Sequence, residues 1–85
     1  MTGVPRHALD LRTLGSVLRA LRRESGLTQE QLSFRCHLTT ALISDSENGK
    51  RNLSFESIAR LLAALDVSWE HFGAAIHRAG RRAAK

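Results

Sequence analysis

The apolar residues of this chain recur at intervals of three and four positions, and the alternation typical of strands is missing. In residues 11–24, Leu11, Leu14, Leu18 and Leu21 follow this spacing, which puts them in one stripe along an α-helix. Leu, Ala and Arg are the commonest residues and favour helices, as Glu does, whereas proline occurs once. The sequence therefore predicts an all-α fold.

Helix boundaries are marked by residues that favour the two ends of a helix. A Ser, Thr or Asp precedes each apolar stripe and can cap its first turn. Thr28 with Gln31 has the pattern of a capping box, and Gly26 and Gly49 tolerate the left-handed backbone that ends many helices. These signals predict five helices, at residues 11–24, 29–36, 40–48, 55–65 and 69–79.

The 85 residues have room for one hydrophobic core. We expect residues 1–9 to be a flexible lead-in, residues 10–79 to form a single domain and residues 80–85 to be a frayed basic tail. The cluster formed by Arg78, Arg81, Arg82 and Lys85 is either a solvated end or an arm that contacts phosphates or a partner.

The third segment, 40–48, differs from the others because small polar side chains fill its middle. Together with 29–36 and the short turn between them it has the pattern of a helix-turn-helix. Leu42 and Ile43 can anchor the segment on a core. Its other side carries short side chains that can approach base edges closely, namely Thr40, Ala41, Ser44, Asp45 and Asn48.

Charge and hydropathy limit the class of protein. Thirteen Lys and Arg against eight acids give a formal charge of +5, which fits nucleic acid as a partner and equally fits a soluble basic surface. No apolar run approaches the ~18 residues of a membrane span, and the N-terminus has no apolar signal core. With one cysteine, Cys36, in the chain, we expect a cytoplasmic, nucleoid-associated protein without a membrane partner.

Enzymatic chemistry has no support in the sequence. The histidines His7, His37, His71 and His77 have no metal-ligand spacing with Cys36. Cys36 also lacks a partner for nucleophilic chemistry, and we expect it to be a small buried side chain. We therefore expect no metal, no cofactor and no enzymatic activity.

Residues 14–72 resemble the Cro and phage-repressor type of helix-turn-helix domain, the XRE family. The resemblance is carried by "LG..LR.LR", "GLTQEQL", "IS..E.GKR" and "I..LL.AL.VS", in chain order. It implies a five-helix, λ-repressor-like DNA-binding domain. Members of this family usually bind operator DNA as two-fold dimers.

The resemblance also implies roles for individual residues. Gln29 would contact a phosphate and brace the recognition helix, while Arg22 and Glu47 match a buried ion pair that joins the first and third helices. The positions that face or approach DNA would be Thr39, Thr40, Ala41, Ser44, Asp45 and Asn48, followed by the backbone-contacting Lys50, Arg51 and Asn52.

Five residues depart from the family pattern. Ser33 and Cys36 replace the usual Ala of the second helix, and both are small enough to permit close helix packing. His37 stands where the turn usually has Gly, so the turn requires a histidine at positive φ. Ser46 replaces a large apolar residue, which weakens the anchoring of the recognition helix. Asp45 stands where a basic or amide residue is common; it either accepts from a cytosine amino group, stays solvated, or pairs with Lys50 or Arg51.

The fifth helix carries an apolar stripe formed by Trp69, Phe72 and Ile76. We expect these residues to lie in the core. A late helix often forms the dimer contact in this family, so part of the stripe, with Ala75 and Ala79, is also a candidate for contact with a second copy.

Together these features predict a sequence-specific DNA-binding transcriptional regulator, most simply a repressor. As a homodimer it would set two copies of helix 40–48 in successive major grooves of an inverted-repeat operator, about 34 Å apart. A phage-type repressor, a restriction–modification controller and an antitoxin with a cognate toxin protein remain open. The alternative is a protein-interaction module of this fold without DNA binding, favoured by Asp45 and Ser46 but opposed by Lys50 and Arg51.

Overall fold

The computed structural model describes residues 10–83, and this part of the chain contains five α-helices and no strand. The helices are α1 (Leu11–Glu24), α2 (Gln29–Cys36), α3 (Thr40–Glu47), α4 (Phe55–Leu65) and α5 (Trp69–Ala83). The predicted five-helix, all-α fold is confirmed. The predicted lead-in and residues 84–85 lie outside the described residues.

Side chains cap the starts of the helices at the predicted positions. Asp10 accepts from the backbone N–H of Arg12 at 2.7 Å, and Thr39 accepts from that of Leu42 at 3.0 Å. Thr28 and Gln31 form the reciprocal capping box. Each of these bonds satisfies backbone donors that a helix start leaves unpaired, which is why the predicted starts agree with the structure.

The predicted end of the fifth helix at residue 79 is wrong. Helix α5 continues to Ala83, so residues 80–83 are helical instead of forming a frayed tail. Gly80, the first residue of the predicted tail, is buried within the helix. The arginines that follow it favour helix, so a single glycine does not end this one.

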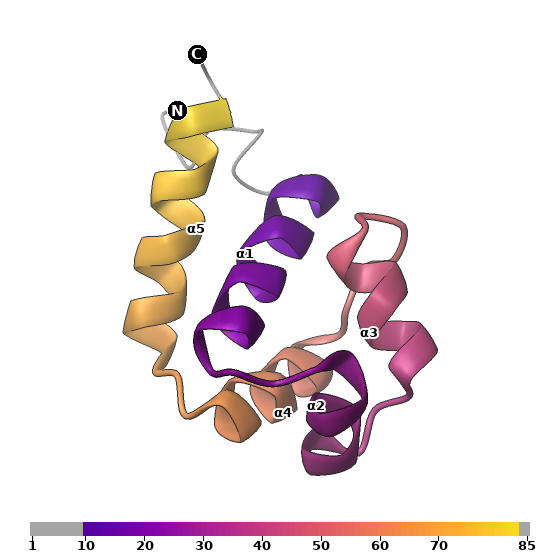
Figure 1. The fold of residues 1–85 in the computed structure, drawn as a ribbon. Coiled ribbons are helices and arrows are strands. Elements are labelled where there is room, and N and C mark those ends of the chain that lie inside the picture. Colours follow the sequence, from indigo (N-terminus) through magenta and orange to yellow (C-terminus); the bar gives the residue numbers. More distant parts are fainter. Residues whose placement is uncertain (1–9, 84–85) are drawn as a thin grey trace.

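Helix α1 lies between α5 on one side and α3 on the other, while α2 and α4 close one end of the bundle (Figure 1). The core between them is apolar and draws on every helix, with Leu18 and Leu21 from α1 and Leu61 and Leu62 from α4. Each such side chain stabilises the fold by about 1.5–3 kcal/mol. Cys36 is buried in the same core, as predicted.

Trp69 is not the core residue that the stripe on α5 predicted. Its side chain is 46% exposed, whereas Phe72 is 9% exposed and Ile76 packs partly buried against the core. The Trp69 ring stacks on Phe55 at the start of α4, with centroids 5.0 Å apart. Phe55 is itself 75% exposed, so the pair forms an aromatic patch on the surface.

Helices α1 and α3 approach each other unusually closely at Gly15. A Cβ atom added there would lie 2.3 Å from the carbonyl oxygen of Ser46 and 2.7 Å from that of Glu47. The absence of a side chain at Gly15 is therefore what allows the end of α3 to rest on α1.

Candidate nucleic-acid interface

The turn between α2 and α3 is closed by a histidine in a left-handed conformation. His37 has φ 60° and ψ 33°, and its backbone N–H donates to the carbonyl of Ser33 at 3.0 Å. The Ser33 hydroxyl donates to the carbonyl of Leu38. The turn thus keeps the backbone that the family usually builds with glycine, at the modest cost of a non-glycine residue at positive φ.

Helix α3 has the two sides that its sequence predicted. Ile43, Ser46 and Glu47 are buried toward the rest of the domain. On the other side Ala41 and Asn48 are exposed, and Thr40, Ser44 and Asp45 are half-buried. The described part of the chain therefore leaves this polar side accessible.

The remaining predicted contact residues lie around α3. Thr39 is exposed at its start, and Lys50, Arg51 and Asn52 are exposed in the loop that follows it. Gln29 is half-buried at the start of α2. Thr39 and the Lys50 loop thus flank the two ends of α3, and Gln29 contacts Glu47 at its end; their contact with DNA stays a prediction.

A buried polar cluster holds the end of α3 against α1 and α2. The predicted pair is present: the Arg22 guanidinium donates from Nε to Glu47 Oε2 at 2.6 Å and from Nη2 to Oε1 at 2.9 Å. Gln29 Nε2 also donates to Glu47 Oε1, at 3.1 Å. Arg22 Nη1 reaches the carbonyl of Leu27 at 2.8 Å, so the cluster spans α1, α2, α3 and the loop between the first two.

Opposing effects act on the pKa of Glu47. Burial raises the pKa of this carboxyl, but hydrogen bonds from Arg22, Gln29 and Arg19 and the charge of Arg22 outweigh it. The net pKa of Glu47 lies below its usual range. Conversely, the hydrogen bond to Glu47 raises the pKa of Arg22, so the pair is held in its charged form.

Ser46 lies on the side of α3 that faces the apolar core. It is 2% exposed, and its hydroxyl oxygen has no hydrogen-bond partner within residues 10–83. Beside it is a void of about 10 Å³ lined mainly by Leu18, Leu32 and Ile43, at the lower limit for a water molecule. The missing apolar side chain thus leaves a poorly filled site, and the polar cluster of Glu47 supplies anchoring in its place.

Asp45 does not form either of the ion pairs considered from the sequence. Of the residues that the structure describes, neither Lys50 nor Arg51 comes within 4.0 Å of its carboxylate. The backbone N–H of Lys50 instead donates to the backbone carbonyl of Asp45 at 2.8 Å. The carboxylate is left half-buried on the outward side of α3.

Sequence reasoning missed Arg19, which joins α1 to the end of α3. Its Nη2 donates to Asn48 Oδ1 at 2.6 Å, and its Nε lies 3.5 Å from Glu47 Oε1. Arg19 precedes Arg22 by three residues, so the two share a helix face. That spacing was the available signal once Arg22 had been assigned to Glu47.

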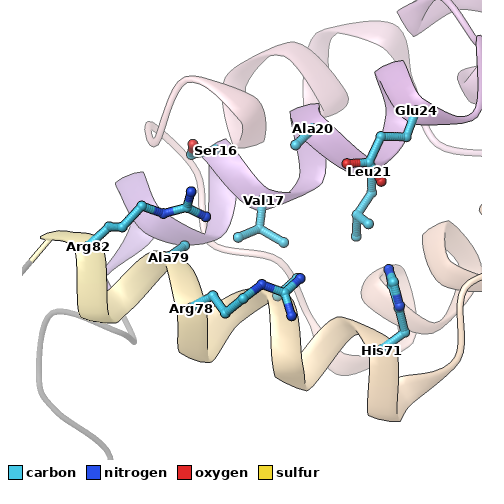
Figure 2. Close-up of a pocket in the computed structure, with 10 residues that line it drawn as sticks. Ser16, Val17, Ala20, Leu21, Glu24, His71, Arg78, Ala79 and Arg82 are labelled. Carbon is cyan, nitrogen blue, oxygen red and sulfur yellow. The ribbon is translucent and has the colours of Figure 1, made fainter.

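The basic end of α5 lies on the other side of α1. Arg78 and Arg82 line a shallow groove of about 130 Å³ between α1 and α5, together with His71 and Glu24 (Figure 2). Helix α3 packs on α1 from the opposite direction (Figure 1). These arginines are therefore separate from the predicted interface, and Lys85 lies outside the described residues.

A protein-family model, "Helix-turn-helix", matches residues 18–72. The chain therefore belongs to the XRE-type helix-turn-helix family, as its motifs predicted. Across residues 10–83 no helix is long and apolar enough to cross a membrane. In the same region no group of three His, Cys, Asp or Glu side chains could hold a metal ion.

Within this family the chain is similar to control proteins of restriction–modification systems. It is 41% identical to the control protein C.BamHI of Bacillus amyloliquefaciens over 54 residues, 62% of this chain and 67% of that protein. This chain is also 38% identical to the controller protein C.AhdI from Aeromonas hydrophila. The match to the crystal structure of that protein has a TM-score of 0.71 and covers 75% of this chain and 97% of that chain.

A third similarity is to a controller protein solved with DNA. This chain is 30% identical to C.Esp1396I, and the TM-score is 0.79 against the crystal structure of the C.Esp1396I tetramer in complex with its natural 35 base-pair operator. The match covers 84% of this chain and 93% of that chain.

Proposed function

We propose that this chain is a transcriptional regulator of the restriction–modification controller type, which binds its operator as a homodimer through α3. The observation that carries the proposal is the accessible polar side of α3, held from behind by the buried Glu47 cluster. The similarity to C.Esp1396I, which was solved as a tetramer on its operator, supports the same reading. An antitoxin or a DNA-free interaction module lacks comparable support.

The proposed DNA contacts divide into two kinds. Lys50, Arg51 and Asn52 contribute affinity through the phosphate backbone, assisted by Gln29 and Thr39 at two helix N-termini. The sequence is read by Thr40, Ala41, Ser44 and Asp45 in the major groove. The Asp45 carboxylate has no cationic partner among the described residues. It is therefore available to accept a hydrogen bond from the amino group of a cytosine.

The proposed dimer uses the aromatic patch of Phe55 and Trp69. These rings are the largest apolar groups exposed on α4 and α5, and the Trp69 ring also forms a T-shaped contact with Phe72, with centroids 6.1 Å apart. A second copy would cover rings that otherwise remain in contact with water. Such a regulator acts in the cytoplasm, at the nucleoid, without enzymatic activity or cofactor.

The test is selection of bound sequences from random duplexes. We expect enrichment of an inverted repeat, and binding whose log affinity falls with log salt with a slope near −5, if each protomer neutralises about three phosphates. Thr40→Ala combined with Ser44→Ala should remove the preference for the enriched sequence while folding is retained. Ser16→Ala, on the exposed side of α1 that faces α5, is the matched control.

Two results would contradict the proposal. Failure of the wild-type protein to enrich any sequence would exclude sequence-specific binding. Unchanged selectivity in the Thr40 and Ser44 variant would mean that α3 is not the reading element.

A further inference from the structure

Arg19 and Asn48 form a contact that joins α1 to the exposed end of α3. The Arg19 guanidinium donates from Nη2 to Asn48 Oδ1 at 2.6 Å, a short distance typical of a charge-assisted hydrogen bond. The Arg19 side chain is 36% exposed, and Asn48 is exposed. The bond therefore lies at the border between the buried Glu47 cluster and the proposed DNA-binding surface.

The chemistry of the pair fixes which way the Asn48 amide is turned. A guanidinium has only donors, so the atom that faces it must be the amide oxygen and not the nitrogen. The nitrogen, with two N–H groups, is on the opposite arm of the amide plane. An asparagine held in this way offers donors to a partner and keeps its acceptor turned toward α1.

The position of Arg19 is itself fixed from behind. Its Nε lies 3.5 Å from Glu47 Oε1, and Glu47 is held by Arg22 and Gln29. Because Glu47 is 2% exposed in its side chain, the inner end of this chain of contacts cannot move freely. Asn48 is also the C-cap of α3, so its backbone is ordered together with the recognition helix.

We propose that Arg19 is a positioning residue that sets the hydrogen-bonding polarity of Asn48, so that Asn48 meets DNA as a donor. This inference rests on the proposed function. Phosphate oxygens and the acceptor atoms of guanine and thymine suit such a donor. The paired contact of asparagine with adenine needs the amide oxygen as well, and Arg19 disfavours it by turning that oxygen away.

The test is a double-mutant cycle on the affinity for the selected duplex, with Arg19→Met, Asn48→Ala and both changes together. Asn48→Ala should weaken binding about tenfold, the effect of losing a hydrogen bond to a charged group. Arg19→Met should weaken binding by a similar factor in the wild-type background. In the Asn48→Ala background its effect should be about threefold at most, because only the loss of charge and of the 3.5 Å contact with Glu47 remains.

Two further variants separate polarity from charge and from folding. Asn48→Asp keeps the acceptor that Arg19 needs but has no N–H donor and adds a negative charge near the phosphates, so it should bind more weakly than Asn48→Ala. Arg60→Met removes the same charge from the surface of α4, where Arg60 pairs with Glu56, and should change affinity less than about threefold. Thermal melting of each variant identifies any loss of folding, and Arg19→Ala, which also removes the guanidinium, replaces Arg19→Met if the latter does not fold.

Each outcome has a defined meaning. Effects of Arg19→Met that are equal in both backgrounds, or an Asn48→Asp protein that binds like the wild type, would overturn the inference and leave the proposed function in place. A wild-type protein that enriches no duplex would overturn both. A coupling of about threefold or more between the two residues, together with weak binding by Asn48→Asp, supports the positioning role, since an arginine that acts on DNA only through its charge would act independently of Asn48.

Discussion

Glu47 is a charged residue on the side of α3 that is otherwise turned toward the core. Its carboxylate is 2% exposed and accepts from Arg22, Gln29 and Arg19. A buried charge is tolerated only when it is paired and hydrogen-bonded, and removal of one partner of a buried pair costs about 3–5 kcal/mol. The Glu47 carboxylate is thus one of the contacts that fix the position of α3, beside the apolar contacts of Ile43.

We expect Glu47→Gln to lower the free energy of unfolding by about 3 kcal/mol at pH 7. Glutamine fills the same space but leaves the buried Arg22 without a counter-charge. Urea unfolding of the wild type and the variant measures the difference. Arg60→Met, which breaks the exposed pair between Arg60 and Glu56, is the matched control and should change stability by less than about 1 kcal/mol.

The same pair gives stability a defined dependence on pH. The pKa of Glu47 is lowered in the folded protein, whereas an unfolded glutamate has a pKa of about 4.3. The charged carboxylate therefore contributes its full share to the free energy of unfolding at pH values above the unfolded pKa. This contribution is lost as the pH falls through the lower pKa of the folded protein. The difference in the free energy of unfolding between wild type and Glu47→Gln should be constant from pH 7 to about 5 and should shrink below about pH 4. A difference in this free energy that widens in acid would contradict the assignment.

At the scale of elements, the spacing between α1 and α3 is set by Gly15. Alanine favours a helix over glycine by about 1 kcal/mol, so Gly15→Ala would strengthen α1 in isolation. In the folded protein its Cβ would lie 2.3 Å from a backbone oxygen of α3, and backbone cannot rotate away as a side chain can. The clash outweighs the gain in helix propensity, and α3 must shift.

We therefore expect Gly15→Ala to lower the free energy of unfolding by about 2 kcal/mol and to weaken operator binding. Gly73→Ala is the matched control, because no atom lies within 4 Å of a Cβ added there. It should stabilise the protein by up to about 1 kcal/mol. Thermal melts of the two variants suffice, and equal effects of the two substitutions would show that α1 and α3 are not in close contact at Gly15.

Local signals were enough to predict the helices and the two sides of α3. Caps such as Thr28 and Thr39 act within one turn, and the spacing of apolar residues reports which face is buried. The continuation of α5 through Gly80 and the exposure of Trp69 depend on which helix each residue packs against. The bond from Arg19 to Asn48 joins residues 29 positions apart, and the spacing of Arg19 and Arg22 on α1 points to it only once the pairing of Arg22 with Glu47 is known.

At the scale of the whole molecule, the aromatic patch and the recognition helix belong to different parts of the bundle. Phe55 and Trp69 lie at the starts of α4 and α5, where the rings stack with an interplanar angle of 8°, while α3 lies on the far side of α1 from α5 (Figure 1). A dimer formed through the patch would therefore leave both copies of α3 uncovered. Two such helices joined in one particle bind an inverted repeat far more tightly than one, because the second contact becomes intramolecular.

We expect Phe55→Ser to shift the protein toward monomer while each domain stays folded, because the ring is 75% exposed and contributes little to its own core. Phe34→Ser, at a ring that is 85% exposed on α2, is the matched control and should leave the dimer intact. Sedimentation velocity measures the oligomeric state, and titration of full and half operators measures its consequence. The Phe55→Ser variant should lose at least about tenfold in affinity for the full operator and little in affinity for the half-site. If both phenylalanine variants dissociate the dimer equally, dimerisation does not depend on the aromatic patch in particular.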